Sequence, residues 1–233
     1  GAVGADLGVV FDRAAERLYL VDDTGEEVPH EQVLLLFLQL FAADGVRGKL
    51  AFPVTVTNLV ERMVEGSGLE VVRTPASLAE LTQAAAGDGV VFAGAVGGGY
   101  VFPEFLPAYD AIAALCKLLQ LLAPQERPLS QLVAELPRST LVHRAVPCPW
   151  AAKGIVMRLL NERFADRDVD VTDGIKVHEE RGWVQVLPDP DEPVVHVYAE
   201  GETDEDSEAL GRDLGGIVEE IVQGAQAETR TSG

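Results

Sequence analysis

The chain has 233 residues, with 18 lysines and arginines against 38 aspartates and glutamates, so its formal net charge is −20. We therefore expect no nucleic-acid partner, because affinity for nucleic acid depends on cations that neutralise phosphates. Apolar residues make up 47% of the composition, but the longest apolar runs are far too short to span a bilayer. No basic segment followed by a long apolar core opens the sequence, so we expect no secretory signal, no membrane anchor and a cytoplasmic location.

The first thirty residues predict two strands. The apolar segment "DLGVVF" and the segment "LYLVDDTGEEV", which ends in an Asp-Thr-Gly turn, are both typical of strands. Asp12, Glu16 and Arg17 gather in the short loop between them. A loop with two carboxylates raises the question of whether it binds a metal ion.

The next part of the chain predicts an α/β domain. A strongly apolar helix ends at Gly45, and strands then alternate with helices as far as "GVVFAG", with Ser77 near the start of one helix. The segment "AVGGGYVFPEF" is expected to be a loop. Apolar residues then recur at helical spacing and predict a core-facing stripe, namely Ala108, Ala111, Ile112, Leu115, Leu118, Leu119 and Leu122.

The last part predicts a separate α+β domain. Prolines around "LSQLVAEL" indicate a linker with one short helix, and the helical segment "WAAKGIVMRLLNERF" follows. Three strands, "GIKVHEE", "WVQVLP" and "VVHVYAE", are joined by short turns, and a final helix runs from about 204 to 222 with Thr203 as its cap. An antiparallel sheet packed with two helices is therefore expected.

Three stretches resemble the phosphohexomutases, the α-D-phosphohexomutase superfamily that includes phosphomannomutase and phosphoglucomutase. These stretches are "GADLGVVFDRAAER", "FAGAVGGGYVFPEFLPAYD" and "DGIKVHEERGWVQVLPDPDEPVVHVYAE". They match, in order, the metal loop, the sugar loop and the phosphate loop of the family. The resemblance implies that residues 1–30 end a truncated second domain, whose strands should pair with each other or with a neighbouring chain. It further implies an α/β third domain at 31–124, a linker at 125–139, an α+β C-terminal domain at 140–225 and a tail at 226–233.

The metal loop departs from the family pattern. The family holds Mg²⁺ with three aspartates, in keeping with the preference of this ion for oxygen ligands. Here Arg13 replaces a glycine, Ala14 replaces the second aspartate and Glu16 replaces the third. We expect Asp12 and Glu16 to be a vestigial metal site without an ion. An ion pair between an arginine and one of these carboxylates should hold the loop in place.

The sugar loop has lost its polar side chains. A glutamate, a serine and a histidine that bind sugar hydroxyls in the family correspond here to Ala95, Gly97 and Gly99. Gly97, Gly98 and Gly99 remain as the remnant of this loop. A glycine run can bind an anion through its amides, but a flexible or tightly turned loop is the expected structure.

The phosphate loop has changed most. The family sequence "RPSGTEP" is here "LPDPDEP", in which Leu187 stands for the arginine and Pro190 for the glycine. Asp189, Asp191 and Glu192 form the remnant of the loop, and their charges should repel a phosphate.

Three of the four histidines, His30, His143 and His178, are not expected to act as ligands or catalysts. His196 stands where the family has a further arginine. His30, His143 and His178 lie in separate predicted elements and lack the sequence spacing of metal ligands.

We therefore expect no catalytic residue and no cofactor in this chain, and the phosphoserine of the family lies in a first domain that the sequence does not contain. The resemblance favours a catalytically inactive module, the structural or regulatory C-terminal part of a sugar-1-phosphate nucleotidyltransferase of the mannose-1-phosphate guanylyltransferase type, in nucleotide-sugar biosynthesis. The expected partners are the rest of the parent chain, a second copy of the chain, and a sugar phosphate or nucleotide sugar.

Two alternatives stay open. The chain could be a fragment of an active, Mg²⁺-dependent phosphohexomutase, an isomerase. It could also be a protein-interaction module without a small ligand, since the stretch from Leu187 to Glu208 has nine acidic residues and no lysine or arginine.

Overall fold

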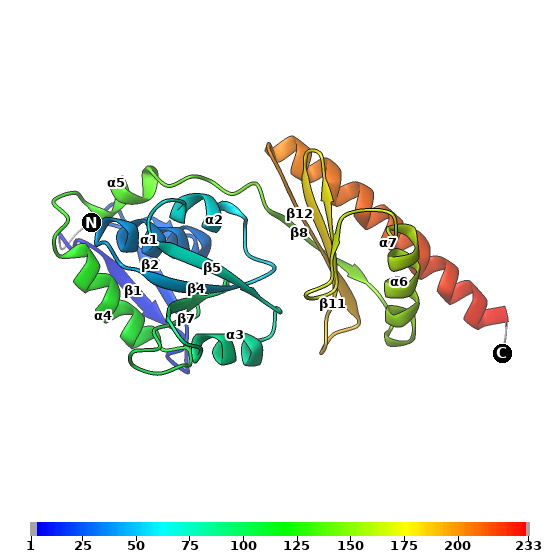
Figure 1. Ribbon diagram of the computed structural model, residues 1–233, viewed down its shortest axis with the longest axis horizontal. Helices are drawn as coiled ribbons and strands as arrows, with labels where there is room; N and C mark the ends of the chain where they lie inside the picture. Colours follow the sequence, from blue (N-terminus) through cyan, green and yellow to red (C-terminus); the bar gives the residue numbers. More distant parts are fainter. Residues whose placement is uncertain (1–3, 232–233) are drawn as a thin grey trace. The chain divides into compact units, whose positions relative to one another are not determined.

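The computed structural model describes residues 4–231, and the side chains of residues 4–225. The chain divides into two compact units, Gly1–Arg138 and Ser139–Gly233 (Figure 1). The first unit is a mixed α/β structure and the second packs helices against an antiparallel sheet, as the sequence predicts.

A small antiparallel sheet opens the first unit. Its strands β1 (Gly8–Phe11), β2 (Leu18–Val21) and β3 (Glu27–Val28) lie in the order β1-β2-β3. The two predicted strands thus pair with each other. Buried side chains of β2 and β3 share one hydrophobic core with the following helix, and the assignment of residues 1–30 to the end of a second domain stays a prediction.

A four-stranded mixed sheet forms the centre of the first unit. Strands β4 (Gly48–Pro53), β5 (Leu69–Thr74) and β6 (Val90–Gly94) are parallel, in the order β5-β4-β6, and helices α2 (Leu59–Val64) and α3 (Leu78–Ala85) connect them. The sheet is completed by β7 (Tyr100–Val101), antiparallel to β6, in a segment expected to be only a loop. Each connection is helical because parallel strands require a crossover.

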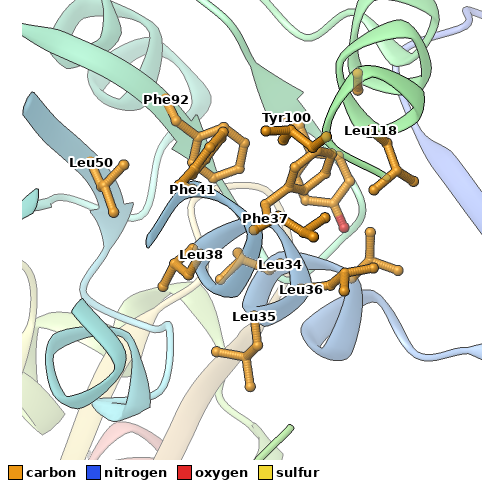
Figure 2. Packing of buried hydrophobic residues seen from close by; sticks show 14 of the residues in the cluster. Leu34, Leu35, Leu36, Phe37, Leu38, Phe41, Leu50, Phe92, Tyr100 and Leu118 are labelled. Carbon is orange, nitrogen blue, oxygen red and sulfur yellow. The ribbon is translucent and has the colours of Figure 1, made fainter. Parts of the chain in front are cut away.

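Helix α1 (His30–Ala43) is the core of the first unit (Figure 2). Its buried side chains surround the helix and are Val33, Leu34, Leu35, Leu36, Phe37, Leu38, Leu40 and Phe41. A helix that is apolar on all sides is stable only when it is enclosed. Phe37 packs against Phe92 and Tyr100, at ring-centroid distances of 5.4 and 5.1 Å, so α1 covers one face of the mixed sheet.

The other face of the mixed sheet is covered by α3. Ala51 and Ala93 point to this side and form a smaller cluster with Leu81 and Ala85 of the helix. Ser77 caps α3 as predicted, because its side chain accepts a hydrogen bond from the amide of Glu80.

The predicted stripe at the end of the first unit is wrong in part. Helix α4 (Ala111–Leu122) buries Ala111, Ala114, Leu118 and Leu121, whereas Ile112 and Leu119 of the predicted stripe are 55% and 47% exposed. The short helix expected within the linker at 125–139 is confirmed as α5 (Leu129–Ala134), and three leucines in and just after it are buried in the core of this unit.

The second unit is a five-stranded antiparallel sheet with two helices. Its order is β8 (Val142–Pro147), β12 (Val194–Gly201), β11 (Gly182–Pro188), β10 (Ile175–Glu179) and β9 (Val169–Asp170). Helices α6 (Trp150–Arg163) and α7 (Asp204–Thr231) cover the same face of this sheet (Figure 1). Strands β8 and β9 were not predicted.

Thr203 caps α7 as predicted, since its hydroxyl accepts a hydrogen bond from the amide of Asp206. The expected tail at 226–233 is instead a continuation of α7 as far as Thr231, and its last two residues lie outside the described part. In residues 4–231 we find no helix with both the length and the apolar character needed to cross a membrane.

Candidate functional site

The loop between β1 and β2 is closed by Asp12. One carboxylate oxygen of Asp12, Oδ1, accepts hydrogen bonds from the amides of Glu16 at 2.8 Å and Arg17 at 3.1 Å. These hydrogen bonds hold the pKa of Asp12 below its ordinary value, and the bond from the amide of Arg17 has the largest effect. The turn also requires a positive φ of 55° at Ala15, an uncommon conformation for a residue with a side chain.

This donor set does not fit the Mg²⁺ ion that the family implies. Asp12 already uses one oxygen for the turn, and no group of three or more carboxylate, histidine or cysteine side chains within residues 4–225 could hold a metal. The expected ion pair within this loop is also absent from the described part, since neither Asp12 nor Glu16 is paired with Arg13 or Arg17. The prediction of this ion pair is therefore wrong. The absence of Mg²⁺ binding stays a prediction.

The glycine loop lies directly beside this turn. The amide of Leu18 donates to the carbonyl of Gly98 at 3.0 Å, and Arg17 forms an isolated β-bridge with Gly99. The structure therefore brings together two of the predicted site segments, which are more than 75 residues apart in sequence.

Two aromatic side chains occupy the space that side chains on the glycine loop would need. A Cβ atom at Gly98 would lie 2.4 Å from the ring of His30, and one at Gly99 would lie 2.5 Å from the ring of Tyr109. Gly98 also has a φ of +80°, which favours glycine. A Cβ at Gly97 would contact nothing within 4 Å. The glycine loop is thus a tight turn packed on rings, with room for a side chain at Gly97.

The same packing makes His30 and Tyr109 candidate binding residues, which the sequence did not suggest. Burial lowers the pKa of His30 and raises that of Tyr109, so both rings are held in their neutral forms. His30 Nδ1 is a buried atom without a hydrogen-bond partner.

The third predicted segment, the loop between β11 and β12, lies in the second unit. Asp189 Oδ1 accepts hydrogen bonds from the amides of Asp191 at 2.7 Å and Glu192 at 2.6 Å. Its other oxygen, Oδ2, lies 2.9 Å from Nε2 of His196. The His196 bond is the largest of the effects that lower the pKa of Asp189 to about 2. The amides of this loop are therefore already bound to a carboxylate of the chain itself.

Lys153 of α6 holds the carbonyl groups of the same loop. Its ammonium group donates to the backbone oxygens of Asp189 and Glu192, and it lies 3.7 Å from the centre of the Trp150 ring. Lys153 is 9% exposed, so its charge is compensated by carbonyl dipoles and an aromatic face. Lys153 was not singled out from the sequence, and its neighbours in the segment "CPWAAKG" gave no signal for this role.

His30, His143 and His178 lie in separate elements as predicted, in α1, β8 and β10, but His143 has a neighbour that was not predicted, His196 of β12. Strands β8 and β12 are paired, and Nε2 of His143 lies 2.9 Å from Nδ1 of His196. The ring of His143 stacks on that of Tyr198, with centroids 4.6 Å apart. Sequence spacing could not reveal this pair, because 53 residues separate the two histidines.

Comparison with known proteins agrees with this architecture. Residues 29–140 match the family "Phosphoglucomutase/phosphomannomutase, alpha/beta/alpha domain III". A Methanopyrus kandleri protein named "Probable phosphoglucosamine mutase" is 32% identical over 224 residues, which cover 95% of this chain and 50% of that protein. The crystal structure of a phosphoglucomutase/phosphomannomutase family protein from Burkholderia thailandensis superposes with a TM-score of 0.79 at 20% identity, over 94% of this chain and 48% of that one. N-acetylphosphoglucosamine mutase from Aspergillus fumigatus, solved with GlcNAc-6P and magnesium, gives a TM-score of 0.67 at 13% identity, over 92% of this chain and 48% of that one.

The fold and these matches define a sugar-phosphate mutase architecture. The chain belongs to the α-D-phosphohexomutase superfamily, and it corresponds to the C-terminal portion of its relatives. It spans about half the length of the curated relatives that it matches. These relatives are named as mutases, which gives no support to the expected fusion to a guanylyltransferase.

Proposed function

We propose that this chain supplies the C-terminal half of a protein that interconverts hexose phosphates, with hexosamine phosphates as the first substrates to test. The observation that carries the proposal is the match to a protein named as a phosphoglucosamine mutase across 95% of the chain. In this function the chain provides the glycine loop from its first unit and the loop at 189–193 from its second unit.

The test is an assay of the full natural protein that contains this sequence. It is incubated with glucosamine 6-phosphate and Mg²⁺, and the 1-phosphate is followed by ³¹P NMR. Glucose 6-phosphate and mannose 6-phosphate serve as comparison substrates. Transfer of phosphate between C6 and C1 at an enzyme-like rate is the expected result, and no transfer with any of the three sugars contradicts the proposal.

One observation favours a second candidate, a module that binds a sugar phosphate or holds an assembly together without catalysing phosphate transfer. The carboxylate of Asp189 accepts hydrogen bonds from two amides of the loop that holds phosphate in the family. Thermal-shift measurements with the same sugars separate the candidates. A ligand at 100 times its Kd stabilises the protein by about 2.7 kcal/mol, so a shift without turnover supports the second candidate.

A further inference from the structure

We propose that His143 and His196 form a binding site for a divalent transition-metal ion of the Cu²⁺, Ni²⁺ or Zn²⁺ class. The site lies wholly in the second unit, and it does not rest on the function proposed above, although Asp189 belongs to the loop at 189–193. Nε2 of His143 and Nδ1 of His196 are 2.9 Å apart. Two nitrogens bound to one ion at about 2.0–2.1 Å stand roughly 2.9 Å apart at a right angle and about 3.3 Å apart in a tetrahedron. The observed separation therefore fits both geometries with little movement.

His196 is already oriented as a metal ligand. Its Nε2 lies 2.9 Å from Oδ2 of Asp189, and a carboxylate accepts the proton of that nitrogen, which leaves the lone pair on Nδ1. Metal-binding histidines commonly donate their second nitrogen to a carboxylate in this way, which fixes both tautomer and ring orientation. Asp189 is itself held by the amides of Asp191 and Glu192. One ligand and its supporting carboxylate are thus in place before an ion arrives.

His143 is the accessible member of the pair. It is exposed and lies on β8, which pairs with β12 from Val142 opposite Ala199 to Pro147 opposite Val194. The ion would lie to one side of the line between the two nitrogens, so the His143 ring must turn when it binds. Neutral His143 then carries its proton on Nδ1 instead of Nε2, and no charge has to be created. The paired strands keep the two rings close throughout.

The chemistry of the pair selects the class of metal. Imidazole nitrogens suit copper, nickel and zinc, whereas Mg²⁺ prefers oxygen ligands. Within residues 4–225, no group of three or more histidine, cysteine, aspartate or glutamate side chains has metal-binding geometry, so water molecules complete the coordination shell. Affinity should then follow the general order for nitrogen sites, with Cu²⁺ above Ni²⁺ and Zn²⁺. The net charge of −20 favours the approach of any cation.

The site is tested by titrating the chain with CuCl₂, NiCl₂, ZnCl₂ and MgCl₂ in a calorimeter. We expect one Cu²⁺ ion per chain and no comparable Mg²⁺ binding. His143→Gln and His196→Gln should each weaken Cu²⁺ binding at least tenfold. Asp189→Asn should weaken it by about 10- to 100-fold, the usual effect of removing a carboxylate behind a ligating histidine. His178→Gln is the matched control, because His178 is an exposed histidine of the same sheet, and it should leave the affinity unchanged.

A second measurement uses the unmodified chain, so its result does not depend on whether the variants fold. Addition of Cu²⁺ in less than molar equivalence should broaden the imidazole NMR signals of His143 and His196 before those of His178 and His30. Broadening of all four histidines together, or Cu²⁺ binding that survives both glutamine substitutions in folded protein, overturns the proposal.

Discussion

Asp189 and His196 are joined by a hydrogen bond of 2.9 Å between Oδ2 and Nε2, which ties the loop after β11 to the strand that follows it. The other oxygen of the carboxylate binds two amides of the loop. Lys153 binds two carbonyl groups of the same loop. The loop therefore has its own anion, Asp189, and a cation from α6, Lys153, and these two side chains bind two amides and two carbonyl groups of its backbone.

The charge of Asp189 should stabilise the second unit in a pH-dependent way. Its pKa is lowered from 3.8 to about 2 in the folded chain, so its stabilising effect is fully present above pH 3.8 and is lost as the pH falls toward 2. We expect Asp189→Asn to lower the urea midpoint of unfolding at pH 7 and to approach the wild-type midpoint near pH 2. Asp191→Asn is the control, and an equal effect of the two substitutions at pH 7 would show that the position of Asp189 is not special.

Replacement of Lys153 by methionine should destabilise the second unit. The methionine keeps much of the buried aliphatic chain but removes the donor to two loop carbonyls. A hydrogen bond to a charged group contributes about 1.5–3 kcal/mol, so we expect a loss of that size in the free energy of unfolding from urea denaturation. Arg158→Met provides the control, because Arg158 forms an exposed pair with Glu162 in the same helix, and such pairs contribute less than about 1 kcal/mol. A loss for Lys153→Met no larger than the control contradicts the role assigned to Lys153.

Substitutions in the glycine loop should differ sharply between neighbouring positions. Gly99→Ala places a methyl group 2.5 Å from Tyr109 and should cost about 1–3 kcal/mol of stability, as overpacking usually does. Gly97→Ala meets open space and should change stability by no more than about 0.5 kcal/mol. Adding Tyr109→Leu to Gly99→Ala should recover part of the loss if the ring is the cause. Urea unfolding of the four proteins checks this series, and equal costs at the two glycines would contradict it.

The loop at Asp12 should not bind Mg²⁺ at sub-millimolar concentration, because one of its oxygens is engaged by the turn. Arg13→Gly, Ala14→Asp and Glu16→Asp together restore three carboxylates and should create affinity that calorimetry detects. The same variant with Ala14→Asn in place of Ala14→Asp is the control and should bind more weakly. Sub-millimolar Mg²⁺ binding by the unmodified chain through Asp12 would refute the view that this site is vestigial.

The elements of the fold were predictable where one local signal dominates. Helix α1 follows from its dense apolar composition, and Ser77 and Thr203 mark helix starts because their hydroxyls accept amide hydrogen bonds. The buried face of α4 was misplaced, because nearly every position of that helix is apolar and periodicity alone does not choose among faces. The short strands β7 and β9 have two residues each, too few to show an alternating pattern.

The candidate sites were predictable only as separate segments. The turn at Asp12 and the glycine loop meet through Leu18 and Gly98, a contact that depends on how two sheets pack. The pair of His143 and His196 depends on the register of β8 against β12, and the sequence alone does not specify which strands pair. The role of Lys153 depends on where α6 packs, which again is tertiary information.

The complete enclosure of α1 has a consequence for how the first unit can come apart. The core built around this helix contains side chains from both sheets of the unit. They include Leu18 and Leu20 of the small antiparallel sheet and Leu50 and Phe92 of the mixed sheet. If α1 is withdrawn, both sheets lose the surface that covers an apolar face of each, and about two turns of leucine and phenylalanine side chains meet water. We therefore expect the small antiparallel sheet and the mixed sheet to fold and unfold together as one cooperative unit, although their strands are hydrogen-bonded in separate ladders.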